Sequence, residues 1–374
     1  MATTSPRFDY IDIAKSLGML LIIWGHIHLV GWSNAFVYAF HIPLFFFLSG
    51  MVFDENRYPN FINFLKKKVV SLLVPYVIYS VLTWVVWVLY IYMTGNRTID
   101  IWMPLAETFI AQGSGGFLVH NVPLWFVTCL FVVEVAYYFI QKIQKWLRIA
   151  ILIALPVSSY LLISYVHIFD FTLMPWNIEV AMLAIPFYAL GHVVINRFGH
   201  EGIQIWVKHH KVTSFGLSIV CGGIVACLCQ YNGAISFGHA DMGRNVLLTY
   251  LLAILGIVMM IVVCILLSDI RWNQQKWMNA IKWYGKNSFT AMAIHNPIKG
   301  IMIPIATTMI LAIQKVCCSL LVFDIMGGGN YLLINVLRDI VAFVITLLAT
   351  VVCIVFINFF TNLWNKHLLQ KRTK

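Results

Sequence analysis

Residues 246–268 read VLLTYLLAILGIVMMIVVCILLS, a run of 23 residues that contains no charged side chain. The hydrocarbon core of a bilayer is about 30 Å thick, and roughly 20 apolar residues of α-helix cross it. The run therefore predicts a transmembrane helix. Nine other segments predict one as well: 13–31, 36–53, 69–93, 118–140, 149–167, 178–195, 212–230, 288–311 and 332–360. The sequence thus predicts an all-α protein, a polytopic bundle of about ten transmembrane helices.

The overall composition is typical of a membrane protein. Of the 374 residues, 61% are hydrophobic and only 10% are charged. A water-soluble domain carries about 25% charged residues, which cover its surface. The hydrophobic segments follow one another along the chain, and we find no internal repeat and no polar tract that could fold separately. We therefore expect a single membrane domain over residues 1–374, without an appended soluble domain.

The basic residues are distributed unevenly between the two sets of loops. The N-terminus, the C-terminus and the loops on their side hold 20 lysines and arginines, whereas the opposite loops hold 3. Cytoplasmic loops of membrane proteins carry such an excess of positive charge, so both termini are predicted to lie in the cytoplasm. The net charge of +11 is therefore explained by membrane orientation, and nucleic acid is not an expected partner.

Polar residues inside the first segment are candidates for function, because a charged or polar group is costly within the bilayer. The segment begins with Asp12 and Lys15 and reaches His26 near its far end. At 1.5 Å per residue, His26 lies roughly 16 Å beyond Lys15, which places it near the middle of the membrane. Asp12 is too far along the same helix to orient His26, and we expect it to support Lys15.

Further polar residues occur in three other segments. His41 lies near the outer end of the second segment, and a short loop makes that helix a neighbour of the first, so His26 and His41 are predicted to line one cavity. His295 precedes Pro297 in the ninth segment and is expected closer to the cytoplasmic side, while Glu134 is a buried acid in the fourth. For each histidine the alternative is a hydrogen-bonded packing residue, and Glu134 would then only pair with a neighbouring helix.

The absence of several known catalytic and binding motifs limits the reactions that the sequence supports. The chain contains no GxSxG turn for a serine nucleophile and no nucleotide-binding glycine motif. It also lacks a CxxC pair, so we expect neither a metal site nor a bound cofactor. Histidine suits general base catalysis because its ordinary pKa lies near neutrality. A buried histidine that takes the proton of an attacking alcohol is therefore the simplest reaction to propose.

Five stretches together resemble membrane acyltransferase family 3, in particular its fucose O-acetylase-like branch. They are YIDIAK at 10–15, leading to the Gly-His pair that ends at His26, FHIPLFFFLSG at 40–50, KKKVVSLLVPY at 66–76, PLWF at 123–126 and YGKNS at 284–288. Each stretch alone is a weak signal, but their order and spacing cover nearly the whole chain. Many relatives carry arginine at the positions of Lys15 and Ser71, so the contacts to the donor are expected to differ here.

The resemblance implies a helical membrane enzyme that moves an acyl group, usually acetyl from acetyl-CoA, onto a hydroxyl of a surface polysaccharide or a lipid-linked glycan. It implies a bacterial cytoplasmic membrane and His26 as the general base, to which we add His41 as an oxyanion donor. Asp12, Lys15, Trp125, Glu134 and His295 are expected to support the site or bind substrate, with Trp125 offering a flat face to a sugar ring. CoA phosphates are expected to bind Lys66, Lys67 and Lys68.

Two other functions fit the same hydrophobic pattern. A transporter or flippase for a glycan-related substrate would also need many helices, buried polar residues and prolines, although many transporters have internal repeats, which this chain lacks. A structural subunit of an envelope complex would leave the buried histidines without a role.

Overall fold

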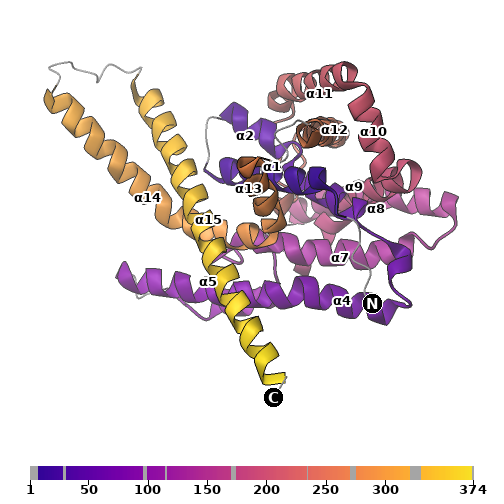
Figure 1. Cartoon of the computed structure of the whole chain (residues 1–374), viewed down its shortest axis with the longest axis horizontal. Helices are drawn as coiled ribbons and strands as arrows, with labels where there is room; N and C mark the ends of the chain where they lie inside the picture. Colours follow the sequence, from indigo (N-terminus) through magenta and orange to yellow (C-terminus); the bar gives the residue numbers. More distant parts are fainter. Residues whose placement is uncertain are drawn as a thin grey trace.

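The computed structural model of the chain is a bundle of α-helices (Figure 1). It describes residues 7–27, 31–95, 99–113, 116–169, 174–233, 235–269, 275–320 and 330–372, and no β-sheet occurs among them. The α-helices are α1 (Asp9–His26), α2 (Gly31–Tyr38), α3 (His41–Met51), α4 (Phe61–Lys68), α5 (Val74–Met93), α6 (Met103–Ala106), α7 (Trp125–Ile140), α8 (Lys145–Phe169), α9 (Ile178–Phe198), α10 (His200–His209), α11 (Lys211–Asn232), α12 (Val246–Asp269), α13 (Lys276–Lys286), α14 (Ser288–Leu320) and α15 (Asn330–Arg372).

Nine helical segments of the described chain are long and apolar enough to cross a membrane, and each coincides with a predicted segment. They are Trp32–Met51, Phe61–Met93, Val122–Ile140, Lys145–Tyr165, Pro175–Phe198, Lys211–Asn232, Val246–Asp269, Ser288–Ile313 and Ile334–Lys366. The tenth predicted segment, 13–31, corresponds to α1, which begins earlier than predicted, at Asp9, and contains the charged residues Asp9, Asp12 and Lys15. The protein is an integral, multi-pass membrane protein with a polytopic helical fold.

Helix α1 occupies the interior of this bundle. It contacts α3, α12, α13 and α14, with further contacts to α2 and α15. Eleven of its residues are buried, including Asp12 and Ser16. A helix with three charged residues would be costly beside lipid, and the surrounding helices replace that contact with protein. In contrast, α5 exposes apolar side chains such as Val81, Leu82 and Val85, as expected of a lipid-facing helix.

Two predicted segments differ from simple rods. The second is broken between α2 and α3, where Phe40 has a φ of −143° and a ψ of −14°, so that His41 begins a new helix. The third starts earlier than predicted, because α4 continues through the π-helical turn Val69–Leu73 into α5. Figure 1 shows α4 and α5 as one long rod at the lower edge of the bundle. Residues 66–68, expected in a loop, are therefore the last turn of α4.

Helices α3 and α9 cross at very close range because each contributes a glycine. A methyl group on Gly50 would overlap the backbone carbonyl oxygen of Tyr188, and one on Gly191 would overlap that of Phe47. Small residues allow such approach between membrane helices, where van der Waals packing replaces the hydrophobic effect as the driving force. The crossing fixes α3, and hence His41 and Ser49, against the rest of the bundle.

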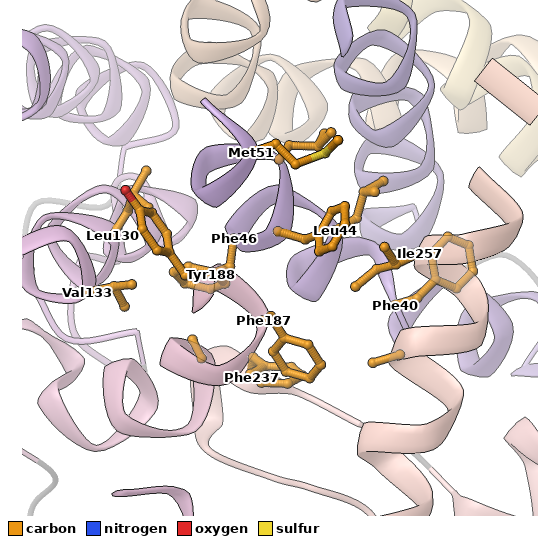
Figure 2. Packing of buried hydrophobic residues seen from close by; sticks show 14 of the residues in the cluster. Phe40, Leu44, Phe46, Met51, Leu130, Val133, Phe187, Tyr188, Phe237 and Ile257 are labelled. Carbon is orange, nitrogen blue, oxygen red and sulfur yellow. The ribbon is translucent and has the colours of Figure 1, made fainter. Parts of the chain in front are cut away.

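Apolar side chains fill the space around that crossing. Figure 2 shows Phe46 and Leu44 from α3 beside Tyr188 and Phe187 from α9. Leu130 and Val133 of α7 and Ile257 of α12 complete the cluster from other sides (Figure 2). Gly256 on α12 makes room for the ring of Phe40, which a methyl group there would overlap. This packing holds α3, the second wall of the candidate site, in one position.

We expect Gly191→Ala to lower the free energy of unfolding, because its methyl group has no space beside the Phe47 carbonyl. Overpacking of this kind costs about 1–3 kcal/mol. Thermal unfolding of purified protein in detergent measures the loss. Gly223→Ala is the matched control, since it adds a methyl group to helix α11 with nothing within 4 Å. An equal melting temperature for both variants would contradict the close crossing.

Candidate active site

An inner cavity of about 180 Å³ lies between four elements of the bundle. Helix α1 contributes Lys15, Ile22 and His26, and the rest of the wall comes from α3, the start of α7 and the start of α14. Four of the five family-like stretches therefore meet at one place. The remaining lining residues are Ile42, Phe45, Ser49, Pro123, Trp125, Phe126, Leu130, Ser288, Phe289 and Met292.

His26 and His295 face each other beside this cavity, with ring centroids 5.2 Å apart. His295 is fully buried, and its Nδ1 lies 2.8 Å from the carbonyl oxygen of Met292. A carbonyl only accepts a hydrogen bond, so Nδ1 carries the proton of the neutral ring and Nε2 presents a lone pair. That Nε2 is buried without a hydrogen-bond partner among the described residues. The pair thus contains a nitrogen that is ready to accept a proton.

The ring of His295 lies 5.2 Å from that of His26, so the two histidines are at similar depth, whereas the sequence placed His295 closer to the cytoplasmic side. The cause is the short helix α13 that precedes α14. Gly285 at the end of α13 packs on the backbone of Asp12 so closely that a methyl group would overlap its carbonyl oxygen. Helix α14 consequently starts inside the bundle, and Ser288 already lines the same cavity as Lys15. Counting residues from a loop could not reveal this offset.

His41 takes a different place from the one predicted. It is buried, its Nδ1 lies 2.9 Å from the Val37 carbonyl oxygen, and it is not among the residues that line the inner cavity. The ring of Tyr38 connects the two predicted histidines, with centroid distances of 4.8 Å to His41 and 6.5 Å to His26. Gly25 permits this approach, since a Cβ there would lie 2.8 Å from the Tyr38 ring. The geometry makes His41 a support for Tyr38, and His295 the histidine beside His26.

Trp125 forms part of the cavity wall, as a substrate-facing residue should. Its indole lies between two glycines: a Cβ on Gly113 would approach it to 2.7 Å and one on Gly238 to 2.8 Å. These glycines come from two loops far apart in sequence, which close over the end of α7. The indole plane is therefore held in one orientation next to the histidine pair. No sequence signal indicated that these two loops meet there.

A second, larger cavity of about 680 Å³ opens on the side that the loop charges assign to the cytoplasm. We call it the cytoplasmic cavity. Lys15 lines both this cavity and the inner one, so the two spaces share a wall at that side chain. Arg7 and Arg57 are its other cations, and its acids are Asp12, Asp54 and Glu55.

Asp12 is engaged in an ion pair within this cavity. Its carboxylate accepts hydrogen bonds from Arg7 at 2.8 and 3.1 Å, whereas Asp12 was expected to support Lys15. His200 also lines the cavity, where its ring stacks on Phe8 with centroids 4.0 Å apart. Burial lowers the pKa of the His200 imidazole, so the ring is neutral at neutral pH. The permanent positive charges that a phosphate would meet here belong to arginine and lysine.

Glu134 and Lys68 form an ion pair, with Nζ and Oε1 2.8 Å apart. Their side chains are only 6% and 18% exposed, and they join α7 to α4. Lys66 and Lys67 are exposed, and none of the three lysines lines either cavity. The structure thus brings Lys15, His26, His295 and Trp125 together and places Lys66, Lys67, Lys68 and Glu134 apart from them.

Residues 8–359 match the sequence model of a family described as an acyltransferase domain. The chain belongs to this acyltransferase family. The match includes every residue of the two cavities except Arg7. No curated protein and no solved structure shows a significant match to the chain. The protein is therefore a membrane acyltransferase, and the residues matched by the family include the histidine pair.

We expect Glu134→Leu to destabilise the protein by about 3 kcal/mol, because it leaves the Lys68 ammonium without its partner in mostly apolar surroundings. The double variant Lys68→Met/Glu134→Leu removes both charges and should lose less stability than Glu134→Leu alone. Unfolding of the single and double variants in detergent gives the coupling between the two residues. Strictly additive losses would show that the ion pair contributes nothing to the α4–α7 contact.

Proposed function

We propose that the protein is an O-acyltransferase that transfers acetyl from acetyl-CoA to a sugar hydroxyl, with His26 as the general base. The observation that carries this proposal is the adjacent His26–His295 pair, beside a cavity whose wall at Lys15 is shared with the cytoplasmic cavity. A transferase of this kind needs a base, a route for the donor and a surface for the acceptor. The arrangement offers a candidate for each.

The donor would come from the cytoplasm, where acyl-CoA is made. The nucleotide and its phosphates would occupy the cytoplasmic cavity near Lys15 and Arg57, and the thinner pantetheine arm would pass Lys15 toward the inner cavity. From Lys15 to His26 the helix rises roughly 16 Å, so the thioester would have to reach deep into the bundle. This route replaces the one expected from Lys66, Lys67 and Lys68, which lie on neither cavity wall.

The reaction itself needs one base that later acts as an acid. The hydroxyl oxygen of the acceptor attacks the thioester carbonyl while His26 takes the hydroxyl proton. The tetrahedral intermediate then collapses, the carbon–sulfur bond breaks, and the proton passes from His26 to the departing CoA sulfur. A positively charged His26 is stabilised in between by the lone pair of a neighbour, and His295 Nε2 is a buried acceptor of that kind.

The acceptor would bind against Trp125. Sugar rings present an apolar face of C–H groups, which packs on a flat aromatic surface. The indole lines the inner cavity and is fixed between Gly113 and Gly238. We therefore propose a sugar of a surface polysaccharide or lipid-linked glycan as the acceptor class, with the enzyme in a bacterial cytoplasmic membrane, as the family resemblance implies.

His26→Ala should lower the transfer rate by about 10²–10⁴-fold, the usual contribution of a general base. The assay uses purified protein in nanodiscs with radiolabelled acetyl-CoA and candidate glycans, and it counts label on the glycan. His209→Ala is the control, because that histidine is exposed on α10 and lines neither cavity. Unchanged transfer in folded His26→Ala would end the base assignment. Glycan movement across the membrane without any covalent product would instead favour a transporter.

Lys15→Gln should raise the KM for acetyl-CoA by about tenfold, which corresponds to the loss of one charge-assisted hydrogen bond of about 1.4 kcal/mol. Lys15→Arg should retain most of the affinity. Lys67→Gln tests the competing donor site, and exposed Lys145→Gln controls for the general loss of positive charge. A raised KM in Lys67→Gln with no effect in Lys15→Gln would return the donor to the α4 lysines.

A further inference from the structure

A third hollow, the outer groove, lies between α5 and α14 and has a volume of about 320 Å³. Its polar wall is formed by His120, Asn296 and Lys299, and its aromatic wall by Trp87 and Tyr90. His120 belongs to the loop between the spans Phe61–Met93 and Val122–Ile140, which the loop charges assign to the outer side. The groove therefore opens on the side opposite to the cytoplasmic cavity. The transfer mechanism above does not use it.

Two polar side chains of the outer groove, His120 and Lys299, lack a partner among the residues that the structure describes. His120 is only 3% exposed, and neither of its ring nitrogens has a hydrogen-bond partner among the described residues. A buried polar group without a partner costs free energy, so native proteins seldom leave one unless something binds there. Lys299 is half-buried, and within the described part of the chain no carboxylate pairs with it. The groove thus holds an unneutralised positive charge beside an unused imidazole.

Burial also determines the protonation state of the His120 imidazole. It lowers the pKa of His120 to about 4, so the ring is neutral at neutral pH and offers one N–H and one lone pair. The ligand that this combination fits carries negative charge for Lys299 and an oxygen that accepts a hydrogen bond from His120. A phosphate group meets both requirements.

The other side of the groove is apolar and open to lipid. Val86 is 44% exposed, Tyr90 46% and Ile301 40%, and all three line the groove on membrane-spanning helices. In a bilayer these surfaces contact hydrocarbon chains. A ligand that enters from this side would therefore keep an apolar chain along α5 and α14 while its charged group lies deeper against Lys299. A free phosphate ion has no hydrocarbon chain and would gain nothing from contact with this apolar wall.

The outer groove and the inner cavity share two structural elements. The stretch 120–123 contributes His120 to the groove and Pro123 to the cavity. Between them, the Asn121 side-chain amide donates a hydrogen bond of 2.6 Å to the Ala293 carbonyl of α14. Lys299 follows His295 by one helical turn, about 6 Å along the axis. A group attached to a phosphate in the groove would thus be next to the histidine pair.

We propose that the outer groove binds the phosphate of a lipid-linked acceptor, which enters sideways from the outer leaflet with its hydrocarbon chain against α5 and α14. Lys299 and His120 hold the phosphate, and the attached sugar extends past Asn121 toward His26 and His295. This proposal rests on the proposed function, since it gives the transferase its acceptor site. It also makes transfer an event in which the donor and the acceptor approach the histidines from opposite faces.

Binding can be measured without any transfer. Full-length protein in detergent is titrated with a long-chain polyprenyl phosphate, and the bound lipid is counted by native mass spectrometry. We expect Lys299→Gln and His120→Leu each to weaken binding at least tenfold. The control variant is Lys286→Gln. It removes an exposed lysine at the C-terminal end of α13 that does not line the groove, so it should bind the lipid as the parent protein does. His26→Ala should also bind normally, so the site is tested even if that histidine is not the base.

Two further ligands separate the sources of the phosphate. Phosphatidylglycerol should bind more weakly than the polyprenyl phosphate and respond less to Lys299→Gln, and inorganic phosphate should not compete at millimolar concentration. Equal binding by phosphatidylglycerol would reduce the groove to a general site for anionic lipids and overturn the proposal. Unchanged polyprenyl phosphate binding in folded Lys299→Gln and His120→Leu would overturn it as well. Normal binding without acyl transfer to any glycan would instead count against the proposed function.

Discussion

The cost of polar groups in hydrocarbon is the constraint on which this structure depends. Helix α1 carries Asp9, Asp12 and Lys15 and ends at His26. Exposure of these side chains to lipid would cost free energy. The bundle avoids this cost by surrounding α1 with α3, α12, α13 and α14. This helix is thereby largely surrounded by protein, and its residues Asp12, Lys15 and His26 line the two cavities. The candidate active site is a consequence of that enclosure.

Glycines make the enclosure tight enough to shape a site. The α3–α9 crossing through Gly50 and Gly191 and the seat of Gly285 on Asp12 bring backbones into direct contact. The contact of Gly285 with Asp12 matters more for the chemistry, because it accompanies the start of α14 inside the bundle, where the His295 ring lies 5.2 Å from that of His26. Packing of small residues, which supplies much of the attraction between membrane helices, here also sets the depth of a functional group.

The histidine pair lies between spaces of opposite character. The cytoplasmic cavity is lined by several charged residues and shares a wall at Lys15 with the inner cavity, whereas the outer groove has an apolar wall and includes Lys299, one helical turn from His295. Such an arrangement suits a reaction between a water-soluble donor and a membrane-bound acceptor, each of which approaches from its own phase. The segment that carries Asn121 is hydrogen-bonded to the Ala293 carbonyl of α14, and it lies between the outer groove and the inner cavity. The break in the second span, where α3 begins at His41, places the ring of Tyr38 beside that of His26.

Sequence alone determined the fold class, the positions of the spans and the polar residues worth examining, because hydrophobicity, loop charge and the cost of buried charge are local properties. His26 and Lys15 were found in this way and Trp125 through the family resemblance, and the structure puts all three on one cavity. Sequence paired His26 with His41 and the donor with Lys66, Lys67 and Lys68. Only tertiary structure placed His295 beside His26 and Glu134 beside Lys68. The depth of a side chain in the membrane and the residues that it contacts depend on how the helices pack. A residue count along one helix contains no information about the neighbouring helix.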